Sequence, residues 1–418
     1  MGTDFFTVNG IRVANIKNSS ENTLFGIAVQ AGSNYETPKI AGISHFSEHM
    51  FFKGTKRRNW HDINMEFAKL GVDNNAYTSN NEVFYHTTCP KDNVEPVIDL
   101  MLDMLFNSTV PEEEFEKERN VIIEEKKMYG DDPYYAFDSV IGEKLFVWEK
   151  GHDVIGSFET LNSITRDDLL GFLKDKTNLK NLLLVCCGDV DSEKLKEYIS
   201  SRIPESHNYL TDGEKNIVDI GFFNPEINYN DKFQLVYERE SLKQSQLTMM
   251  TRGYSVSDPK YNANGVVLSA LGGGMYSKLF TRLREELGLC YSVSMRNLTI
   301  AYPDYSLNRL YSFTSPENVD QFVEESEKVI KDLIKNGLDQ EMFDCAKTDR
   351  LGNILRQTET SRGKAVYLLR KYLFTGEEVT FEESIAKMKS VTIEDCNNII
   401  EEMFSSKYIW AVMNPKGE

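Results

Sequence analysis

The sequence has 418 residues, which is too long for a single hydrophobic core and predicts two domains of about 200 residues each. Hydrophobic residues make up 40% of the chain and aromatic residues 11%, enough for packed interiors, and no apolar run approaches the roughly 20 residues of a membrane span. The net charge of −18 argues against nucleic acid or an anionic membrane surface as a partner.

The N-terminus and the cysteines indicate in which cellular compartment the protein is expected. The first residues, Met-Gly-Thr-Asp-Phe-Phe, lack the basic region and the long apolar region of a signal peptide. No two cysteines have C-x-x-C spacing, and several lie in apolar runs where cysteine acts as a small hydrophobic residue. We therefore expect a reducing, cytoplasmic location. The six cysteines are Cys89, Cys186, Cys187, Cys290, Cys345 and Cys396.

The first half of the chain contains predicted strands followed by predicted helices. Residues 5–31 alternate in polarity and are rich in β-branched side chains, which predicts two strands joined by a polar turn at 18–22. The segment 43–52 follows, and beyond it the apolar periodicity and the glycine positions predict the remaining elements. These are helices over 61–70, 92–106, 110–129, 133–148 and 165–174, and strands over 75–79, 83–88 and 181–187.

The segment from Ile43 to Phe52 contains two histidines four residues apart, with a glutamate directly before the second. On a helix His45, Glu48 and His49 share one face. Two imidazoles at this spacing can bind a tetrahedral zinc ion, with the carboxylate beside the metal. The order H-x-x-E-H reverses H-E-x-x-H and is typical of the inverzincins. The alternative is a pair of structural histidines on a buried helix, because the flanking residues are apolar.

The helix predicted over 110–129 is rich in glutamate and supplies a candidate third ligand. Thr109 and Glu112 are expected to form its capping box, and Gly130 is expected to end it. Glu118 and Glu125 are seven residues apart, two helical turns, and so share one face. A hydrolytic zinc site needs three protein ligands and one open position.

At this point the sequence resembles the pitrilysin/insulinase family of zinc peptidases, most closely its mitochondrial-processing-peptidase-like branch. The resemblance rests on H-x-x-E-H, followed at the family's spacing by a downstream glutamate that has another glutamate two helical turns before it. It implies Glu125 as the third zinc ligand and Glu118 as an acid that supports a ligand. Glu124 competes on spacing, but only Glu125 has the partner two turns earlier.

The second half repeats the plan of the first at an offset near 228 residues. The spacing between Phe115 and Phe146 equals the spacing between Phe343 and Phe374. Such self-similarity predicts two copies of one fold, here called the first copy and the second copy. Only the first copy has the candidate ligands, which a ligand set needed for packing alone would not explain. His45, Glu48, His49 and Glu125 correspond at this offset to Gly273, Tyr276, Ser277 and Asn353.

Strands followed by helices in each half, without strict β-α-β alternation, predict an α+β fold with antiparallel sheets. The family resemblance implies two homologous domains that face each other as a clam shell around a chamber. We predict a zinc-bearing peptidase domain at 1–211, a polar linker at 212–231 and a homologous domain at 232–418 that lacks metal ligands and completes the substrate site.

The resemblance also implies substrate-binding residues. Asn75 and Ala76 look like part of the edge strand on which the family lays its peptide, where an extended chain can pair with free N–H and C=O groups. Arg284 and Tyr291, seven residues apart, resemble the paired residues that reach the substrate from the second domain. The structural alternative is an exposed helix end for Arg284 and a core ring for Tyr291.

The main hypothesis is a zinc-dependent endopeptidase that cleaves peptides or unfolded segments between its two domains, with Glu48 as general base on zinc-bound water. Its cofactor would be Zn²⁺, and the resemblance suggests a possible homodimer. One alternative is a non-catalytic core subunit of a processing complex, since the family includes members that lost the ligands. A purely structural zinc site is disfavoured, because such sites close with four ligands and prefer cysteine.

Overall fold

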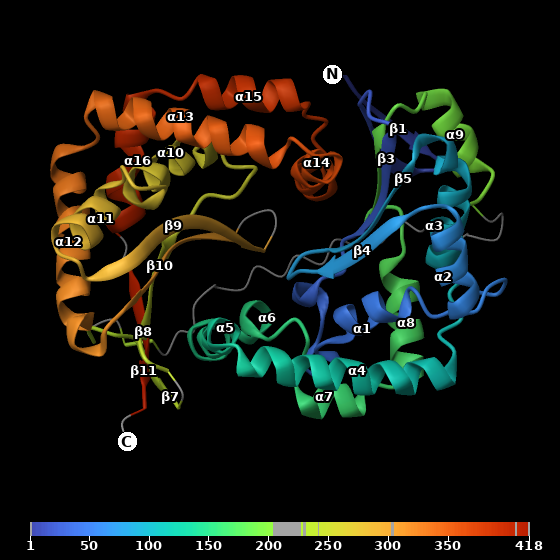
Figure 1. Cartoon of the computed structure of the whole chain (residues 1–418), viewed down its shortest axis with the longest axis horizontal. Helices are drawn as coiled ribbons and strands as arrows, with labels where there is room; N and C mark the ends of the chain where they lie inside the picture. Colours follow the sequence, from blue (N-terminus) through green and yellow to red (C-terminus); the bar gives the residue numbers. More distant parts are fainter. Residues whose placement is uncertain are drawn as a thin grey trace. The chain divides into compact units, whose positions relative to one another are not determined.

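The computed structural model describes residues 2–203, 227–228, 231–240, 242–301, 305–405 and 408–416. The chain forms two compact α+β units (Figure 1). Unit 1 holds the described residues up to Ser139, those from Trp148 to 203, and Gln357–Phe381. Unit 2 holds Val140–Val147, the described residues from 227 to Arg356, and Glu382 to 416. The predicted two-domain α+β class is confirmed.

Unit 1 is built on a sheet with the strand order β1-β2-β6-β3-β5-β4. Neighbouring strands are antiparallel except β2 and β6, which are parallel. The strands are β1 (Thr3–Val8), β2 (Ile11–Lys17), β3 (Asn22–Val29), β4 (Asp73–Thr78), β5 (Val83–Pro90) and β6 (Leu182–Gly188). The sequence interpretation of residues 5–31 as two strands was wrong, because Asn9 and Gly10 both have positive φ and form a hairpin turn within the first one.

The helices of unit 1 include two that carry the candidate ligands, α1 and α4. Phe46 of α1 stacks on Phe115 of α4 with ring centroids 4.7 Å apart, so an aromatic contact fixes the two helices together. Figure 1 shows α1 between α4 and strand β4. The helices are α1 (Ile43–Met50), α2 (Trp60–Lys69), α3 (Val94–Asn107), α4 (Glu112–Asp131), α5 (Pro133–Leu145, which groups with unit 2 from Val140 on), α6 (Trp148–Gly151), α7 (Phe158–Ser163), α8 (Arg166–Lys176) and α9 (Ser192–Ser200).

The ends of α4 differ from the sequence expectation. Its N-cap residue is Pro111, and no side chain caps the helix, so the predicted capping box of Thr109 and Glu112 is absent. Val110 has a φ of +43°, which turns the chain before the helix and leaves Thr109 outside it. The Thr109 hydroxyl instead donates to the Gly54 carbonyl. Gly130 lies inside the helix, whose last residue is Asp131.

A helix from the C-terminal half, α14 (Ser361–Thr375), completes unit 1. It packs on β3 and β6, and the Arg12 guanidinium donates to the carbonyls of Tyr372 and Leu373 near its C-terminus, at 2.8 and 3.0 Å. Every residue of β6 is buried, although successive side chains point to opposite faces of a sheet. The unbroken apolar run in β6 therefore reflects cover on both faces, one of them supplied by α14.

Unit 2 has a sheet with the order β7-β11-β8-β10-β9, in which only β11 and β7 are parallel. Its strand β11 pairs as β6 does in unit 1, with one parallel and one antiparallel neighbour. The strands are β7 (Leu235–Arg239), β8 (Ser245–Arg252), β9 (Cys290–Ala301), β10 (Tyr305–Thr314) and β11 (Ile409–Pro415). The helices are α10 (Tyr261–Gly272), α11 (Lys278–Phe280), α12 (Val319–Asn336), α13 (Gln340–Gln357), α15 (Phe381–Lys389) and α16 (Ile393–Ser405).

The division into units differs from the predicted boundaries at two places. Residues 140–147 group with unit 2 and residues 357–381 with unit 1, whereas the sequence assigned each to the other domain. Of the predicted linker 212–231, only residues 227, 228 and 231 lie within the described residues. Across the part of the chain that the structure describes, no helix combines the length and apolarity needed to cross a membrane.

Candidate metal centre

Helix α1 is held at its N-terminus by a buried carboxylate. Both oxygens of Glu36 accept backbone N–H groups, from Gly42 and from Ser44, each at 2.8 Å. A negative charge at this end of a helix is favourable because the first N–H groups lack helical partners. His152 Nε2 lies 3.0 Å from the same carboxylate. Burial alone would lower the pKa of His152, but the contact with Glu36 outweighs burial, so this pKa is raised. No pattern in the sequence indicated that these residues support the histidine helix.

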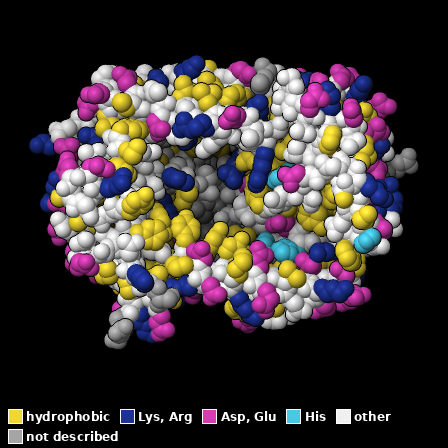
Figure 2. All heavy atoms as spheres, viewed as in Figure 1, with side chains coloured by type: hydrophobic (Ala, Val, Ile, Leu, Met, Phe, Trp, Pro, Cys, Tyr) yellow, Lys and Arg dark blue, Asp and Glu magenta, His cyan; other side chains and the backbone are white. Residues whose placement is uncertain are grey.

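His45, His49 and Glu125 converge at one point between α1 and α4. Oε2 of Glu125 lies 3.2 Å from His49 Nε2 and 3.7 Å from His45 Nε2, and one ligand atom from each of the three lies within 4.8 Å of the others. Zinc bonds of about 2.0–2.1 Å place two tetrahedral ligand atoms roughly 3.3 Å apart. The three donors thus fit a zinc ion without rearrangement of the helices. Figure 2 shows histidine side chains at the surface over α1, so solvent reaches this region.

The structure separates the two glutamates that spacing alone left in competition. Glu125 faces the histidines, whereas the Glu124 side chain is 71% exposed and its carboxylate lies 2.7 Å from Lys127 Nζ. The register of α4 therefore places Glu125, and not Glu124, in the cluster, and its role as a zinc ligand stays a prediction.

Glu118 supports His49 from the side opposite Glu125. Its Oε2 lies 3.0 Å from His49 Nδ1, and its Oε1 lies 2.5 Å from Lys53 Nζ. An ionised carboxylate can only accept hydrogen bonds, so Nδ1 carries a proton and Nε2 is the nitrogen left to bind a metal. His45 has no equivalent support, since its Nδ1 is buried without a hydrogen-bond partner among the described residues.

The charges around His49 favour a cation at this point. Burial would lower the pKa of His49, but hydrogen bonds to Glu118 and Glu125 outweigh it and raise this pKa to about 9. Burial and the neighbouring His49 lower the pKa of His45. The hydrogen bond from His49 holds the pKa of Glu125 below its ordinary value. A metal ion bound between these groups must displace the proton on His49 Nε2.

Glu48 lies beside the cluster and is not one of its three donors. Its Oε2 accepts a short hydrogen bond from the hydroxyl of Thr78, the last residue of β4. Burial raises the pKa of Glu48, and the Thr78 hydrogen bond partly opposes that rise. A carboxylate with a raised pKa is better suited to proton transfer near neutral pH. Sequence reasoning missed Thr78, because its contact depends on how β4 packs on α1.

Asn75 and Ala76 lie on β4, the edge strand of the unit 1 sheet, as predicted. They pair with His86 and Tyr85 of β5, so their other side is the open edge. The Asn75 side chain accepts a hydrogen bond from the Ala76 N–H at 2.8 Å. An extended peptide that pairs at Ala76 would compete with this contact for the N–H group.

Arg284 and Tyr291 lie together in unit 2. The Arg284 guanidinium is 5.2 Å from the centroid of the Tyr291 ring, and this ring is 82% exposed, so it is not the core side chain of the structural alternative. A cation over an aromatic face is attracted by the ring quadrupole, so this contact holds the two side chains together. Their action on a substrate bound at the metal cluster of unit 1 stays a prediction.

Comparison with known proteins identifies the family. Residues 12–143 match the family described as Insulinase (Peptidase family M16), and residues 163–349 match the Peptidase M16 inactive domain. The chain belongs to the M16 peptidase family. All three donors of the metal cluster lie in the first matched segment, and the ligand-free second copy lies largely in the second. The mitochondrial-processing-peptidase-like branch stays a prediction.

Relatives of this M16 protein span nearly its whole length. The Bacillus subtilis protein named uncharacterized zinc protease YmxG is 28% identical over 411 residues, covering 98% of this chain and 97% of its own. A Rickettsia felis protein, also named an uncharacterized zinc protease, is 29% identical over 405 residues, or 94% of this chain and 93% of its own. The crystal structure of a protease from Helicobacter pylori has the same fold, with a TM-score of 0.85 at 18% identity over 99% of both chains.

Proposed function

We propose that this M16 family member is a zinc-dependent endopeptidase that cleaves peptides or unfolded segments. The observation that carries the proposal is the meeting of His45, His49 and Glu125 at distances that suit one zinc ion, with Glu48 beside them. Relatives that cover almost the whole chain bear the name zinc protease, which supports the same conclusion.

The residues around the cluster have distinct roles in this proposal. A zinc ion held by His45, His49 and Glu125 would supply a Lewis acid that polarises a carbonyl and lowers the pKa of water. Glu48 accepts the proton of the attacking water and returns it to the leaving amine. Its burial keeps the proton affinity high enough for that return. Glu118 keeps His49 in the tautomer whose Nε2 can bind the metal.

The substrate is proposed to be an extended peptide segment. The open edge of β4 at Asn75 and Ala76 offers backbone groups to such a segment, and β4 also carries Thr78, which contacts Glu48. Arg284 and Tyr291 are proposed to steady the carbonyl oxygen or the peptide backbone. A cytoplasmic location and a homodimer also stay predictions.

Two measurements on the purified full chain test the proposal. Metal analysis is expected to find zinc at about one ion per chain, as a three-ligand catalytic site requires. Incubation with a mixed peptide library is expected to yield internal cleavages, detected by mass spectrometry, that stop when a chelator removes the metal and resume when zinc is restored. A chain that holds zinc but cleaves no library member would favour the alternative of a non-catalytic subunit.

A further inference from the structure

Lys53 makes the shortest ion pair near the metal cluster. It lies three residues beyond the end of α1, and its Nζ is 2.5 Å from Oε1 of Glu118. The other oxygen of Glu118 is 3.0 Å from His49 Nδ1, and His49 Nε2 is 3.2 Å from Glu125. Lys53, Glu118, His49 and Glu125 therefore form an unbroken series of polar contacts that ends at the metal ligands.

The geometry of a carboxylate explains why the second contact matters. The terminal torsion of a glutamate has broad minima, so one hydrogen bond alone leaves its plane free to rotate. Lys53 engages the oxygen that His49 does not use, which fixes both oxygens of Glu118. Because Glu118 is buried, its charge would also lack compensation on this side without the ammonium group.

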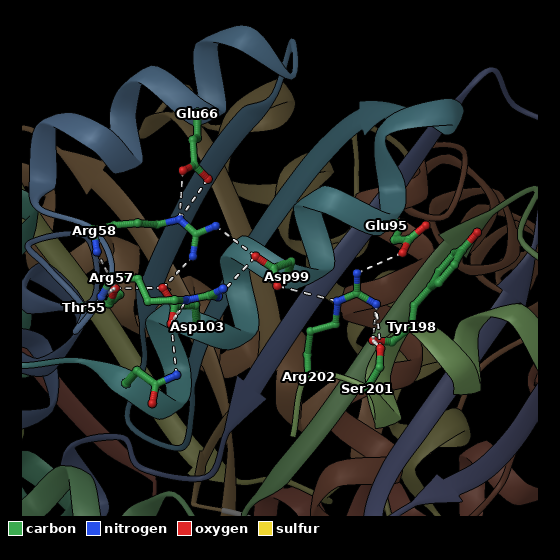
Figure 3. A network of polar contacts seen from close by, with 11 residues as sticks. Thr55, Arg57, Arg58, Glu66, Glu95, Asp99, Asp103, Tyr198, Ser201 and Arg202 are labelled. Atoms are coloured by element: carbon green, nitrogen blue, oxygen red, sulfur yellow. Dashed lines mark hydrogen bonds and ion pairs between the residues drawn. The ribbon is translucent and has the colours of Figure 1, made fainter. Parts of the chain in front are cut away.

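The loop that carries Lys53 is itself fixed by a network of charged side chains around the buried Asp103 (Figure 3). The Thr55 hydroxyl donates to Oδ2 of Asp103 at 2.7 Å, and the guanidinium groups of Arg57 and Arg58 donate to the same carboxylate at 3.1 and 2.7 Å. The Asp103 side chain is fully buried in α3. These contacts join the loop to α3 immediately after Lys53.

Two further contacts complete the anchoring of this loop. Arg58 also contacts Asp99 of α3 and Glu66 of α2, at 2.9 Å each, as Figure 3 shows. The carbonyl of Gly54, the residue after Lys53, accepts the N–H of Thr109 at 3.1 Å, just before α4 begins. The loop is thus tied to the helix that carries Glu118 as well as to α2 and α3. Lys53 starts from a backbone with little freedom to move.

We infer that Lys53 is a positioning residue of the metal centre: it holds Glu118, and Glu118 orients His49 toward the metal. The inference rests on the proposed function, because it assumes that His49 binds zinc. It assigns a role to the loop after the histidine helix, which contributes none of the three donors of the cluster. Lys53 acts only through Glu118, and this condition makes the inference testable.

The test is the zinc affinity of the full chain, measured by competition with a chromophoric chelator and independent of any peptidase assay. Lys53→Met is expected to weaken zinc binding by about 10-fold or more, the range seen when the support of a metal ligand is lost. Lys53→Arg is expected to recover most of that loss, because its guanidinium can reach the same oxygen. Lys117→Met is the matched control: Lys117 precedes Glu118 but pairs with Glu113 and Glu114.

A double-mutant cycle decides whether Lys53 acts through Glu118. Glu118→Gln should weaken zinc binding, and adding Lys53→Met to it should cause no further loss, since the intermediary is already gone. Neither of these two variants leaves a buried carboxylate unpaired, so their comparison stands even if Lys53→Met alone folds poorly.

The outcomes separate this inference from the proposed function. Full zinc affinity in Lys53→Met, or a loss as large in Lys117→Met, would overturn the role of Lys53. So would additive losses in the cycle. If the expected affinities are found but the wild-type chain cleaves no peptide, the role of Lys53 stands and the peptidase proposal fails. A wild-type chain that binds no zinc would overturn both.

Discussion

The first and second copies of the repeat treat corresponding positions in opposite ways. In the first copy, imidazoles and carboxylates of α1 and α4 converge, and the charge at their centre is compensated by a proton or a cation. In the second copy, Tyr276 and Asn353 stand where Glu48 and Glu125 would be. Their side chains instead join a hydrogen-bonded group: Ser269 donates to Asp349 at 2.6 Å, Asn353 donates to Asp349 at 3.2 Å, and the Tyr276 and Ser269 hydroxyls are 3.0 Å apart.

The comparison teaches what the fold needs and what the metal needs. In the second copy, polar contacts join α10 and the turn after it, which holds Tyr276, to α13, and the groups that make them satisfy one another. In the first copy the carboxylates of Glu118 and Glu125 instead pair with a protonated His49, and a bound cation would replace the proton on its Nε2. The predictions below test this difference at matched positions of the two copies.

The largest effect is expected from removing the proposed base. Glu48→Gln keeps the shape of the side chain but cannot accept a proton, so peptidase activity should fall by about 10²–10⁴-fold while zinc content is unchanged. Tyr276→Phe removes the hydroxyl at the matched position of the second copy and should leave activity near the wild-type level. Activity and bound zinc are measured on the same samples. Normal turnover of a zinc-loaded Glu48→Gln protein would exclude Glu48 as the base.

Removing the third ligand should mainly affect the metal. Glu125→Gln is expected to weaken zinc binding by more than ~100-fold, a larger loss than removal of supporting contacts gives. Glu124→Gln makes the same chemical change one residue earlier, on an exposed side chain, and should bind zinc normally. Chelator competition measures both variants. If Glu124→Gln loses zinc and Glu125→Gln does not, the register of α4 at the site is wrong by one residue.

A third change tests whether α14, from the C-terminal half of the chain, stabilises unit 1. Leu369 of α14 is fully buried, so Leu369→Ala should reduce the free energy of unfolding by about 2–5 kcal/mol. Leu355 of α13 is about half exposed, and Leu355→Ala should change the free energy of unfolding by less than ~0.5 kcal/mol. Hydrogen exchange should also become faster in β6, which α14 covers. Unchanged exchange in β6 would show that α14 does not stabilise this sheet.

The place of α14 in unit 1 also predicts how a chain divided in the linker behaves. A fragment that ends in the predicted linker would keep His45, His49 and Glu125 but would lack α14. The face of β3 and β6 under α14 would then be exposed to water. We expect this fragment to be poorly soluble alone and to recover zinc binding when the C-terminal half is added. Gel filtration and zinc titration check this, and a stable, monomeric fragment with full zinc affinity would contradict it.

The smallest effect concerns pH. His49 must lose its Nε2 proton to bind zinc, and its pKa is raised to about 9, so zinc affinity should rise with pH up to about pH 9, by at most ~10-fold per unit. Binding near pH 7.5 should release about one proton, measured by calorimetry in buffers of different ionisation enthalpy. Burial and Asp349 raise the pKa of Tyr276 to about 12, so the hydroxyl at the position that matches Glu48 stays protonated in this range. Zinc binding without proton release would contradict a protonated His49.

In the metal-free protein the raised pKa of His49 makes the free energy of unfolding fall as pH rises, whereas zinc affinity rises with pH. The pKa of His49 is higher in the folded chain than in the unfolded chain, where it is about 6.5. Protonated His49 therefore stabilises the fold fully below about pH 6.5, and this stabilisation is lost as pH rises toward 9. Thermal unfolding of the zinc-free protein at several pH values checks the trend. Bound zinc should reduce it, because the metal then replaces the proton.

The sequence by itself determined the parts of the site that depend on a regular helix. His45, Glu48 and His49 share a face because of the 3.6-residue period, and Glu118 and Glu125 share another for the same reason. The repeat, the two-domain α+β class and most element positions could also be inferred, since periodicity and turn residues are local signals. The Asn9-Gly10 hairpin was a local signal that the interpretation overlooked.

Only the tertiary structure decided which side chains support these residues. Lys53 and Glu118 lie on separate elements far apart in the sequence, and no local period relates them. Thr78 reaches Glu48 because β4 packs on α1, and Glu36 caps α1 because a loop returns to it. Such contacts form when separate elements pack, and their energy depends on burial that the sequence does not display. The sequence therefore predicted the candidate ligands that meet in the cluster, while the groups that hold them in place were set by packing.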